Sequence, residues 1–123
     1  TEAYYRTAST TDFNGLYKGH YIDFDCKETT SKTSFPLSNV HEHQINHLSD
    51  VKEHGGIPFL IVGWKEYSEY YLLKFDDLFY FWQSAKTDGR KSIPYSFFKE
   101  KGINIPFSYE PRLDYLKAVD QLI

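Results

Sequence analysis

Residues Tyr21 to Lys27 read Tyr-Ile-Asp-Phe-Asp-Cys-Lys, and this heptapeptide predicts a strand with one polar and one apolar face. Side chains alternate between the faces of a strand, so Asp23, Asp25 and Lys27 share one side. The other side carries three residues that can enter a core: Ile22, Phe24 and Cys26. Two neighbouring carboxylates make a poor solvent face, because like charges repel and Asp disfavours strands. Oxygen ligands beside a lysine suit a hard cation instead.

Length and composition predict one globular domain over residues 1–123, with 41% hydrophobic and 19% aromatic residues. No apolar run of about 18 residues predicts a membrane span, and the N-terminus shows no secretory signal. The lone Cys26 cannot form an internal disulfide, which indicates a reducing, cytoplasmic compartment. The chain begins at Thr1 rather than at Met, so it can be part of a longer protein.

The formal net charge of −3 argues against a nucleic-acid partner, but the charge is unevenly distributed. Residues 86–102 carry five basic side chains against two acidic ones. A basic segment beside an acidic centre suits a metal site next to a phosphate backbone. On charge alone, an ordinary solvated loop and helix is the favoured interpretation of this segment.

Turn and cap signals divide the first half of the chain. Asn14-Gly15 predicts a turn between strands Ala8–Phe13 and Leu16–Thr29. Thr30–Ser38 reads as a loop. Asn39 and Glu42 resemble a capping box, and a helix is expected from there to Gly55-Gly56.

The second half predicts a buried strand at Ile57–Trp64, paired with Glu69–Phe75 through a short turn. Three helices follow: one capped by Asp76, one opened by Pro94 and ended by Gly102, and one opened by Pro111. The last is expected to turn Leu113, Leu116, Val119 and Leu122 or Ile123 inward. The order of elements indicates an α/β domain with a mixed central β-sheet flanked by helices.

Asp12, Asp23, Asp25 and Lys27 form the strongest chemical pattern, if a hairpin brings Asp12 beside the second strand. Carboxylates can hold a divalent ion that activates water for phosphodiester hydrolysis, while an ammonium steadies the developing charge. From the pattern alone, an exposed edge strand with an Asp–Lys pair worth about 0.5 kcal/mol stays the alternative.

Three further patterns are weaker. His43 and His47 share a helix face as zinc ligands often do, but Gln44 stands where a metalloprotease needs Glu. Cys26 would have to be the third ligand from a core-facing position, so solvated histidines are favoured. A Cys26 thiol nucleophile lacks a base, and its apolar neighbours indicate burial. Gly89–Ser92 lacks the first glycine of a phosphate loop.

Seven ordered motifs run through the whole chain: Thr10–Gly15, Tyr17–Thr29, Lys32–Leu37, His41–Gln44, Glu53–Gly56, Gly89–Pro94 and Pro111–Tyr115. Together they resemble the RecU family of bacterial Holliday junction resolvases. The resemblance implies a restriction-endonuclease-like nuclease fold and a homodimer that cuts four-way DNA junctions with Mg²⁺ or Mn²⁺. It also implies a place at the nucleoid and permits a recombinase as a partner.

The resemblance also implies site roles. Asp12 and Asp25 would bind the metal together with the backbone carbonyl of Cys26, and Lys27 would orient water or stabilise the phosphate. Gln44 and Thr10 would lie next to this site or touch the scissile phosphate. Asp23 and Glu28 rank as supporting residues.

Two departures from the family pattern stand out. The chain has Asp25-Cys26-Lys27 where the family usually has Glu-x-Lys, so its carboxylate is one methylene shorter. The resemblance implies that the family's N-terminal helix and strand lie outside the given sequence, so residues 1–9 are expected to be the remnant of the stalk that enters the junction. The expected DNA-binding residues are Tyr4, Tyr5 and Arg6 in this remnant, with Arg90 and Lys91.

Three functions follow as hypotheses. The first is a metal-dependent, structure-selective endonuclease that resolves Holliday junctions. The second, motivated by the Asp25 departure, is a catalytically weak junction-binding or recombinase-modulating module. The third is a sequence-specific restriction endonuclease with the same chemistry.

Overall fold

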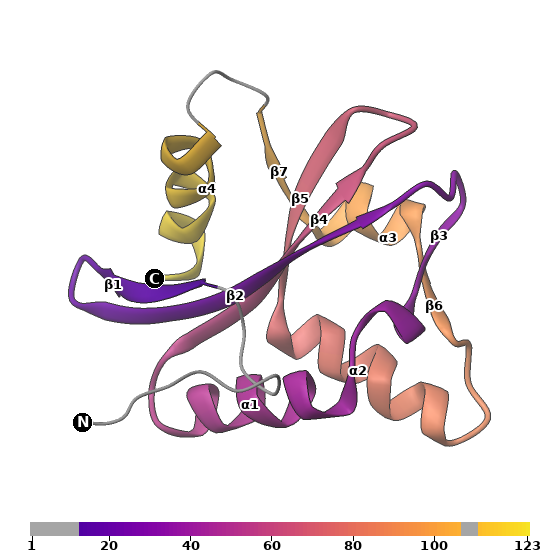
Figure 1. Ribbon diagram of the computed structural model, residues 1–123, viewed down its shortest axis with the longest axis horizontal. Coiled ribbons are helices and arrows are strands. Elements are labelled where there is room, and N and C mark those ends of the chain that lie inside the picture. Colours follow the sequence, from indigo (N-terminus) through magenta and orange to yellow (C-terminus); the bar gives the residue numbers. More distant parts are fainter. Residues whose placement is uncertain (1–12, 107–110) are drawn as a thin grey trace.

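A five-stranded mixed sheet forms the centre of the computed structural model, which describes residues 13–106 and 111–123, without the side chains of 111–114 (Figure 1). The strand order is β1-β2-β4-β5-β7. The bounds are β1 Phe13–Tyr17, β2 His20–Thr29, β4 Ile57–Trp64, β5 Glu69–Lys74 and β7 Ile103–Ile105. β2 and β4 are parallel, and the other neighbours are antiparallel. The predicted mixed α/β architecture is confirmed.

Helices cover both faces of this sheet. α1 (Glu42–Glu53), α2 (Phe75–Lys86) and α3 (Tyr95–Lys101) pack on one face, where β3 (Ser34–Pro36) and β6 (Ser92–Pro94) form a small ribbon. α4 (Pro111–Val119) lies on the opposite face and leads into the short helix η2 (Asp120–Leu122). Figure 1 shows α4 on one side of β2 and α1 on the other.

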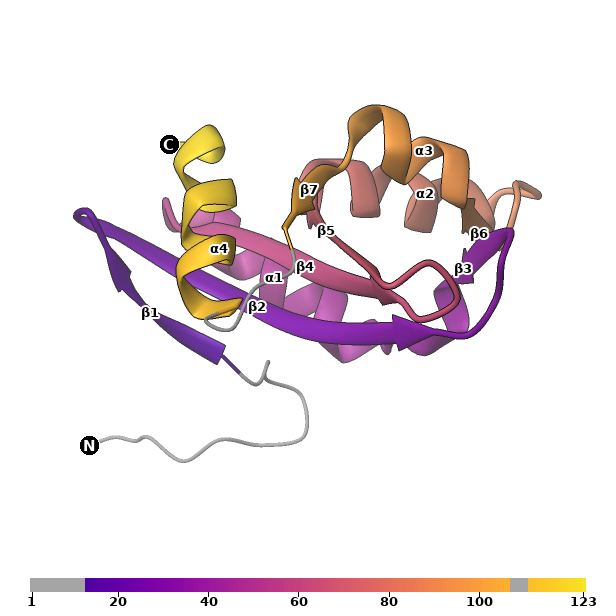
Figure 2. The same ribbon diagram turned by 90° about the horizontal axis from the view of Figure 1, so that it is seen from above.

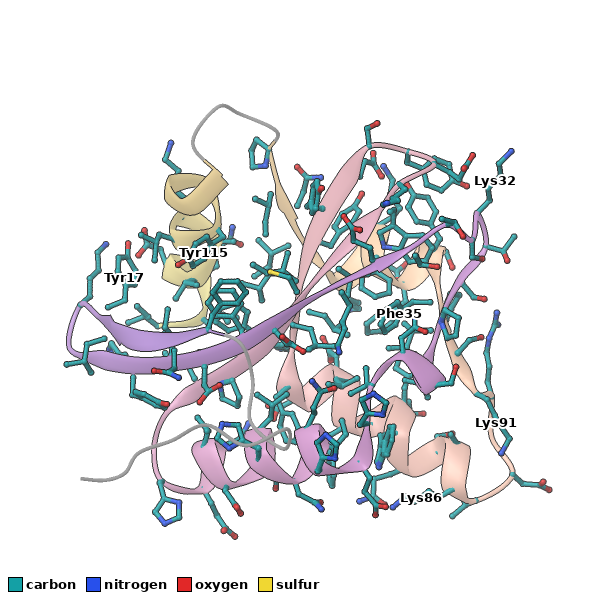
Figure 3. All side chains as sticks on the ribbon, viewed as in Figure 1. Tyr17, Lys32, Phe35, Lys86, Lys91 and Tyr115 are labelled. Carbon is teal, nitrogen blue, oxygen red and sulfur yellow. The ribbon has the colours of Figure 1, made fainter. Side chains whose placement is uncertain are left out.

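The two faces have separate cores. The larger core surrounds Trp64 and includes Phe35, Leu48, Leu60, Leu73, Leu78, Ile93 and Phe98. The smaller core, under α4, contains the stacked rings of Phe24 and Phe59, 4.6 Å apart, and the half-exposed ring of Phe13 stacks on Phe24 from outside this core at 5.0 Å. Tyr115 of α4 tilts onto Phe24 at 5.0 Å (Figure 3). Among the described residues, the buried apolar side chains of β2, Ile22 and Phe24, belong to the smaller core.

The burial of the β2 side chains follows the prediction for five of the six residues that were assigned to a face. Ile22 and Phe24 are buried under α4, while Asp23 and Asp25 contact α1 on the opposite face. Cys26 is the exception: it shares the apolar side but is exposed. The prediction of a core cysteine is therefore wrong, because the buried cluster under α4 includes Ile22 and Phe24 but stops short of Cys26.

The first hairpin turns four residues later than predicted. Lys18 and Gly19 both have positive φ, at 51° and 81°, so they form the two-residue turn between β1 and β2. Asn14 and Gly15 lie inside β1, where they pair with Asp23 and Ile22. The turn at Lys18-Gly19 brings Phe13 opposite Phe24, and their ring stack stabilises this register. Figure 2 shows this hairpin at one end of the molecule.

α1 begins at Glu42 rather than after a cap at Asn39. His41 is the N-cap residue, and its backbone N–H donates to Gln44 Oε1 at 3.2 Å. The predicted stop is confirmed: Gly55 has φ +91°, and the N–H groups of Gly55 and Gly56 donate to the carbonyls of Lys52 and Val51. This is the Schellman pattern at a helix C-terminus.

The strand predicted at Ile57–Trp64 is confirmed without change, and its antiparallel partner ends one residue early, at Lys74. α2 begins at Phe75, so Asp76 lies in its first turn instead of capping it. Pro94 is the N-cap residue of α3 and precedes its first turn, whereas Gly102 is the C-cap residue that stops the helix, as expected. Among the residues expected to face inward near the C-terminal helix, Val119 is buried, and Leu116 and Leu122 pack partly buried against the smaller core. Ile123 is exposed, and the side chain of Leu113 lies outside the described part of the chain. The short strands β3, β6 and β7 were missed.

Candidate active site

Asp25 lies in β2 at the point where this strand passes under α1. The residue is 3% exposed and pairs with Leu60 of β4, whose side chain is in the larger core. Gln44 Nε2 donates to Asp25 Oδ2 at 2.7 Å. Lys27 Nζ lies 3.0 Å from the same oxygen. The structure thus brings together three of the predicted site residues.

Gln44 is held at both ends of its amide. Its Oε1 accepts from the His41 N–H at the start of α1, and its Nε2 donates to Asp25. Because the two amide atoms have opposite hydrogen-bonding roles, this arrangement fixes which way the amide faces. The N-terminal turn of α1 therefore orients the Asp25 carboxylate.

The second carboxylate oxygen of Asp25 has no such partner. Asp25 Oδ1 is buried, and no hydrogen bond to it occurs in the part of the chain that the structure describes. Leaving a buried acceptor unsatisfied costs roughly 1–3 kcal/mol, more for a charged group. A bound cation would satisfy this oxygen, so the donor set fits a divalent metal ligand.

Asp23, two residues earlier on the same face, is fully buried. Its Oδ2 accepts from Tyr21 Oη at 2.8 Å and lies 2.9 Å from His47 Nε2 in α1. The sequence interpretation placed His47 on a solvated helix face, which is wrong for this histidine because it packs against Asp23. The contacts of Tyr21 and His47 with Asp23 were not predicted. The spacing of His47, three residues after Gln44 and therefore on the same helix face, was a usable signal.

No described helix has both the length and the apolar character needed to cross a membrane.

The zinc hypothesis finds no support: within residues 13–106 and 111–123, no group of three His, Cys, Asp or Glu side chains gathers around one point. His43 instead stacks on His41, with ring centroids 5.4 Å apart.

Comparison with known proteins gives the family. A model described as "Recombination protein U" (RecU) matches residues 1–121. The chain belongs to the RecU family. It is 56% identical over 122 residues to a Holliday junction resolvase RecU of Pediococcus pentosaceus, and 51% identical over 122 residues to one of Staphylococcus aureus.

Both RecU comparisons cover 99% of this chain but only 61% and 59% of the relatives. The chain therefore spans about three fifths of the length of the curated relatives that it matches. The match includes every predicted site residue, since all of them lie within residues 1–121. The match confirms the family resemblance that the seven motifs indicated.

The remaining predicted site residues are those outside the described part of the chain, then Glu28, and then the pair Arg90 and Lys91. Tyr4, Tyr5, Arg6, Thr10 and Asp12 lie outside the described residues. Glu28 alternates to the face opposite Asp25 and pairs with Lys65 at 3.4 Å, so the structure does not bring it to the carboxylate. Arg90 and Lys91 are exposed in the loop after α2, where Arg90 Nε donates to Ser92 Oγ at 3.2 Å. Lys91 and Lys86 mark this region in Figure 3.

Proposed function

We propose that this chain carries the catalytic part of a Holliday junction resolvase, a metal-dependent endonuclease that cuts four-way DNA junctions in recombination and repair. The observation that carries the proposal is the Asp25 carboxylate, with Oδ2 bound by Gln44 and Lys27 and Oδ1 buried without a described partner. The names of the RecU relatives support the choice of substrate. A DNA junction as substrate would place this activity in the cytoplasm, at the nucleoid.

The proposed metal is Mg²⁺ or Mn²⁺, held by Asp25 Oδ1, by Asp12 and by the backbone carbonyl of Cys26. Asp12 is bonded to Phe13, which pairs with Phe24, the neighbour of Asp25 in β2. Tyr17 and His20 flank a two-residue turn, so they form a hydrogen-bonded pair. Every second residue of β2, counted from His20, therefore directs its backbone N–H and C=O toward the β1 edge, and Cys26 is one of these residues. Both observations support ligands gathered at this edge of β2.

Side chains divide the chemistry between them. When bound, the metal ion would polarise a phosphoryl oxygen and lower the pKa of its water. Lys27 would orient the attacking water or stabilise negative charge on the phosphate, because its ammonium is already fixed at 3.0 Å from Asp25. Gln44 would hold the carboxylate in place through its hydrogen bond to the same oxygen, Oδ2. Thr10 and Asp23 would support the site.

DNA contacts would come from Arg90 and Lys91 and from Tyr4, Tyr5 and Arg6. Arg90 and Lys91 are exposed and lie in the basic segment that follows α2, which suits a phosphate backbone. Aromatic residues near the N-terminus would stack on unpaired bases at the junction centre. Two symmetric cuts on opposing strands call for a homodimer, and a recombinase would be a further partner.

The decisive experiment incubates the full-length protein with a synthetic mobile junction and Mg²⁺. The wild type and the matched surface control Asp50→Asn are expected to give paired nicks, and Asp25→Asn is expected to bind without cutting. Equal cleavage by wild type and Asp25→Asn would contradict the assignment of Asp25 to the active site. Only monomers in sedimentation at micromolar concentration would contradict the homodimer.

The other two functions predict different products in the same assay. Tight junction binding without nicking in either Mg²⁺ or Mn²⁺ would favour a binding or recombinase-modulating module, for which the shorter Asp25 carboxylate is the motivation. Cleavage of plain duplex at one sequence would favour a restriction endonuclease.

A further inference from the structure

Asp23 is a buried carboxylate to which the proposed chemistry gives only a supporting place. It is fully buried, yet its Oδ2 accepts two hydrogen bonds, from Tyr21 Oη at 2.8 Å and from His47 Nε2 at 2.9 Å. A carboxylate taken out of water needs such partners, because the loss of hydration is otherwise uncompensated. The contact with His47 also joins two elements, since it links β2 to α1.

A second contact of the same kind lies beside it. Asp23 and Asp25 are two residues apart on one face of β2, hence about 6.6 Å along the strand. Their partners His47 and Gln44 are three residues apart in α1 and therefore neighbours on its surface. The Asp23–His47 and Asp25–Gln44 contacts are thus two adjacent links between the same strand and the same helix.

Two hydrogen bonds between β2 and α1 restrict the position of the helix more than one hydrogen bond does. A single hydrogen bond lets a helix rotate about the contact, whereas two bonds a helical turn apart fix both its rotation and its position along the strand. Ile45 and Leu48 also hold α1 on the sheet through the larger core, but apolar packing is non-directional. The direction of the Gln44 amide depends on hydrogen bonds, which weaken steeply with angle.

We propose that Asp23 and His47 are positioning residues, which hold α1 at the place along β2 where Gln44 binds Asp25 Oδ2 and leaves Oδ1 for the metal. This inference rests on the proposed function, because it assigns the pair a task in the metal site. His47 need not touch the DNA or the metal; it acts through Gln44 and Asp25.

The test compares three variants of the full-length protein: His47→Ala, His47→Gln and the matched control His43→Ala, at an exposed position one turn earlier. The readout is the Mn²⁺ concentration that gives half-maximal junction cleavage, together with junction affinity measured without metal. His47→Ala is expected to raise that concentration about tenfold or more, as loss of groups that orient metal ligands does, with unchanged junction affinity.

His47→Gln separates positioning from general stability, because its amide nitrogen reaches as far as Nε2 of histidine and can donate to Asp23. It is expected to restore most of the wild-type metal dependence, while His43→Ala leaves it unchanged. Wild-type metal dependence in His47→Ala, or failure of His47→Gln to restore it, would overturn the proposal.

A second measurement does not require cleavage. His47→Ala and Gln44→Ala are made singly and together, and their effects on unfolding by urea are compared. Positioning predicts a non-additive result, because removing His47 already loosens the Gln44 contact. Additive effects would refute the link between the two pairs. If the wild type fails to cut junctions but the effects are non-additive, the proposed function is wrong and the structural link stands.

Discussion

Gln44 donates to Asp25 across 2.7 Å, from the first turn of α1 to the middle of β2, and both residues are buried. This bond connects residues 19 positions apart in the chain and fixes one oxygen of the carboxylate. Since Lys27 also binds that oxygen, the other is left for a ligand from outside. An incoming ligand is therefore expected to bind on the Oδ1 side of the Asp25 carboxylate.

Gln44→Ala should destabilise the protein and weaken cleavage. The change leaves Asp25 Oδ2 without one of its two partners and creates a small cavity, so the free energy of unfolding should fall by about 1–3 kcal/mol. Urea denaturation measures this loss. Gln83→Ala, at an exposed position of α2, is the control and should change stability by no more than about 0.5 kcal/mol. Equal effects of the two changes would contradict a structural role for the Gln44–Asp25 bond.

Lys27→Met should reduce the rate of junction cleavage by about 10²-fold or more, because it removes the charged donor that lies 3.0 Å from the Asp25 carboxylate. The loss should fall on kcat rather than on junction affinity, which single-turnover kinetics can separate. Lys65→Met is the control, since Lys65 pairs with Glu28 on the surface. A Lys27→Met protein that cleaves at the wild-type rate would exclude Lys27 from the chemistry.

The sequence was sufficient for the parts of the fold with long, regular patterns. Eight consecutive residues of β4 are apolar or Gly, so the strand could be placed without error. β3, β6 and β7 have three residues each, too few for any periodicity to show. The hairpin was misplaced because Asn14-Gly15 is a stronger local turn signal than Lys18-Gly19, and the aromatic pairing of Phe13 with Phe24 overrides it.

The same limit applies to the site. Alternation placed Asp25 and Lys27 together because they are two residues apart in one strand. Gln44 came only from the family resemblance, and the Asp23–His47 contact spans 24 residues between a strand and a helix. Such contacts depend on how α1 lies across the sheet, which no local pattern specifies.

Gly55→Ala should destabilise the end of α1. Gly55 has φ +91°, a conformation that residues with a Cβ adopt at a cost of about 1 kcal/mol, so the midpoint of thermal unfolding should fall by several degrees. Gly15→Ala is a matched control inside β1, where an added Cβ meets no atom within 4 Å and φ is not positive. Equal losses for the two variants would show that backbone conformation is not the cause.

The last prediction concerns the tip of the first hairpin, which is tied to the C-terminal end of the chain. Tyr17 Oη and Lys18 Nζ each lie 2.9 Å from Asp120 Oδ1 in η2. The hydrogen bond from Lys18 holds the pKa of Asp120 below its ordinary 3.8, and Asp120 in turn raises the pKa of Lys18 above 10.5. The Lys18 and Asp120 side chains are 59% and 38% exposed to solvent, so salt should weaken their interaction.

The signs of these two pKa shifts fix the pH window in which the contact stabilises the fold. A carboxylate with a lowered pKa contributes above its unfolded value of 3.8 and loses that contribution as the pH falls through the folded pKa. The lysine contributes below 10.5 and loses its contribution as the pH rises through its raised pKa. Asp120→Asn should therefore lower the thermal midpoint between about pH 5 and pH 9, with a gap from wild type that narrows toward both extremes. Asp88→Asn, in an exposed turn, is the control, and a gap that is independent of pH and salt would disprove the electrostatic origin of the contact.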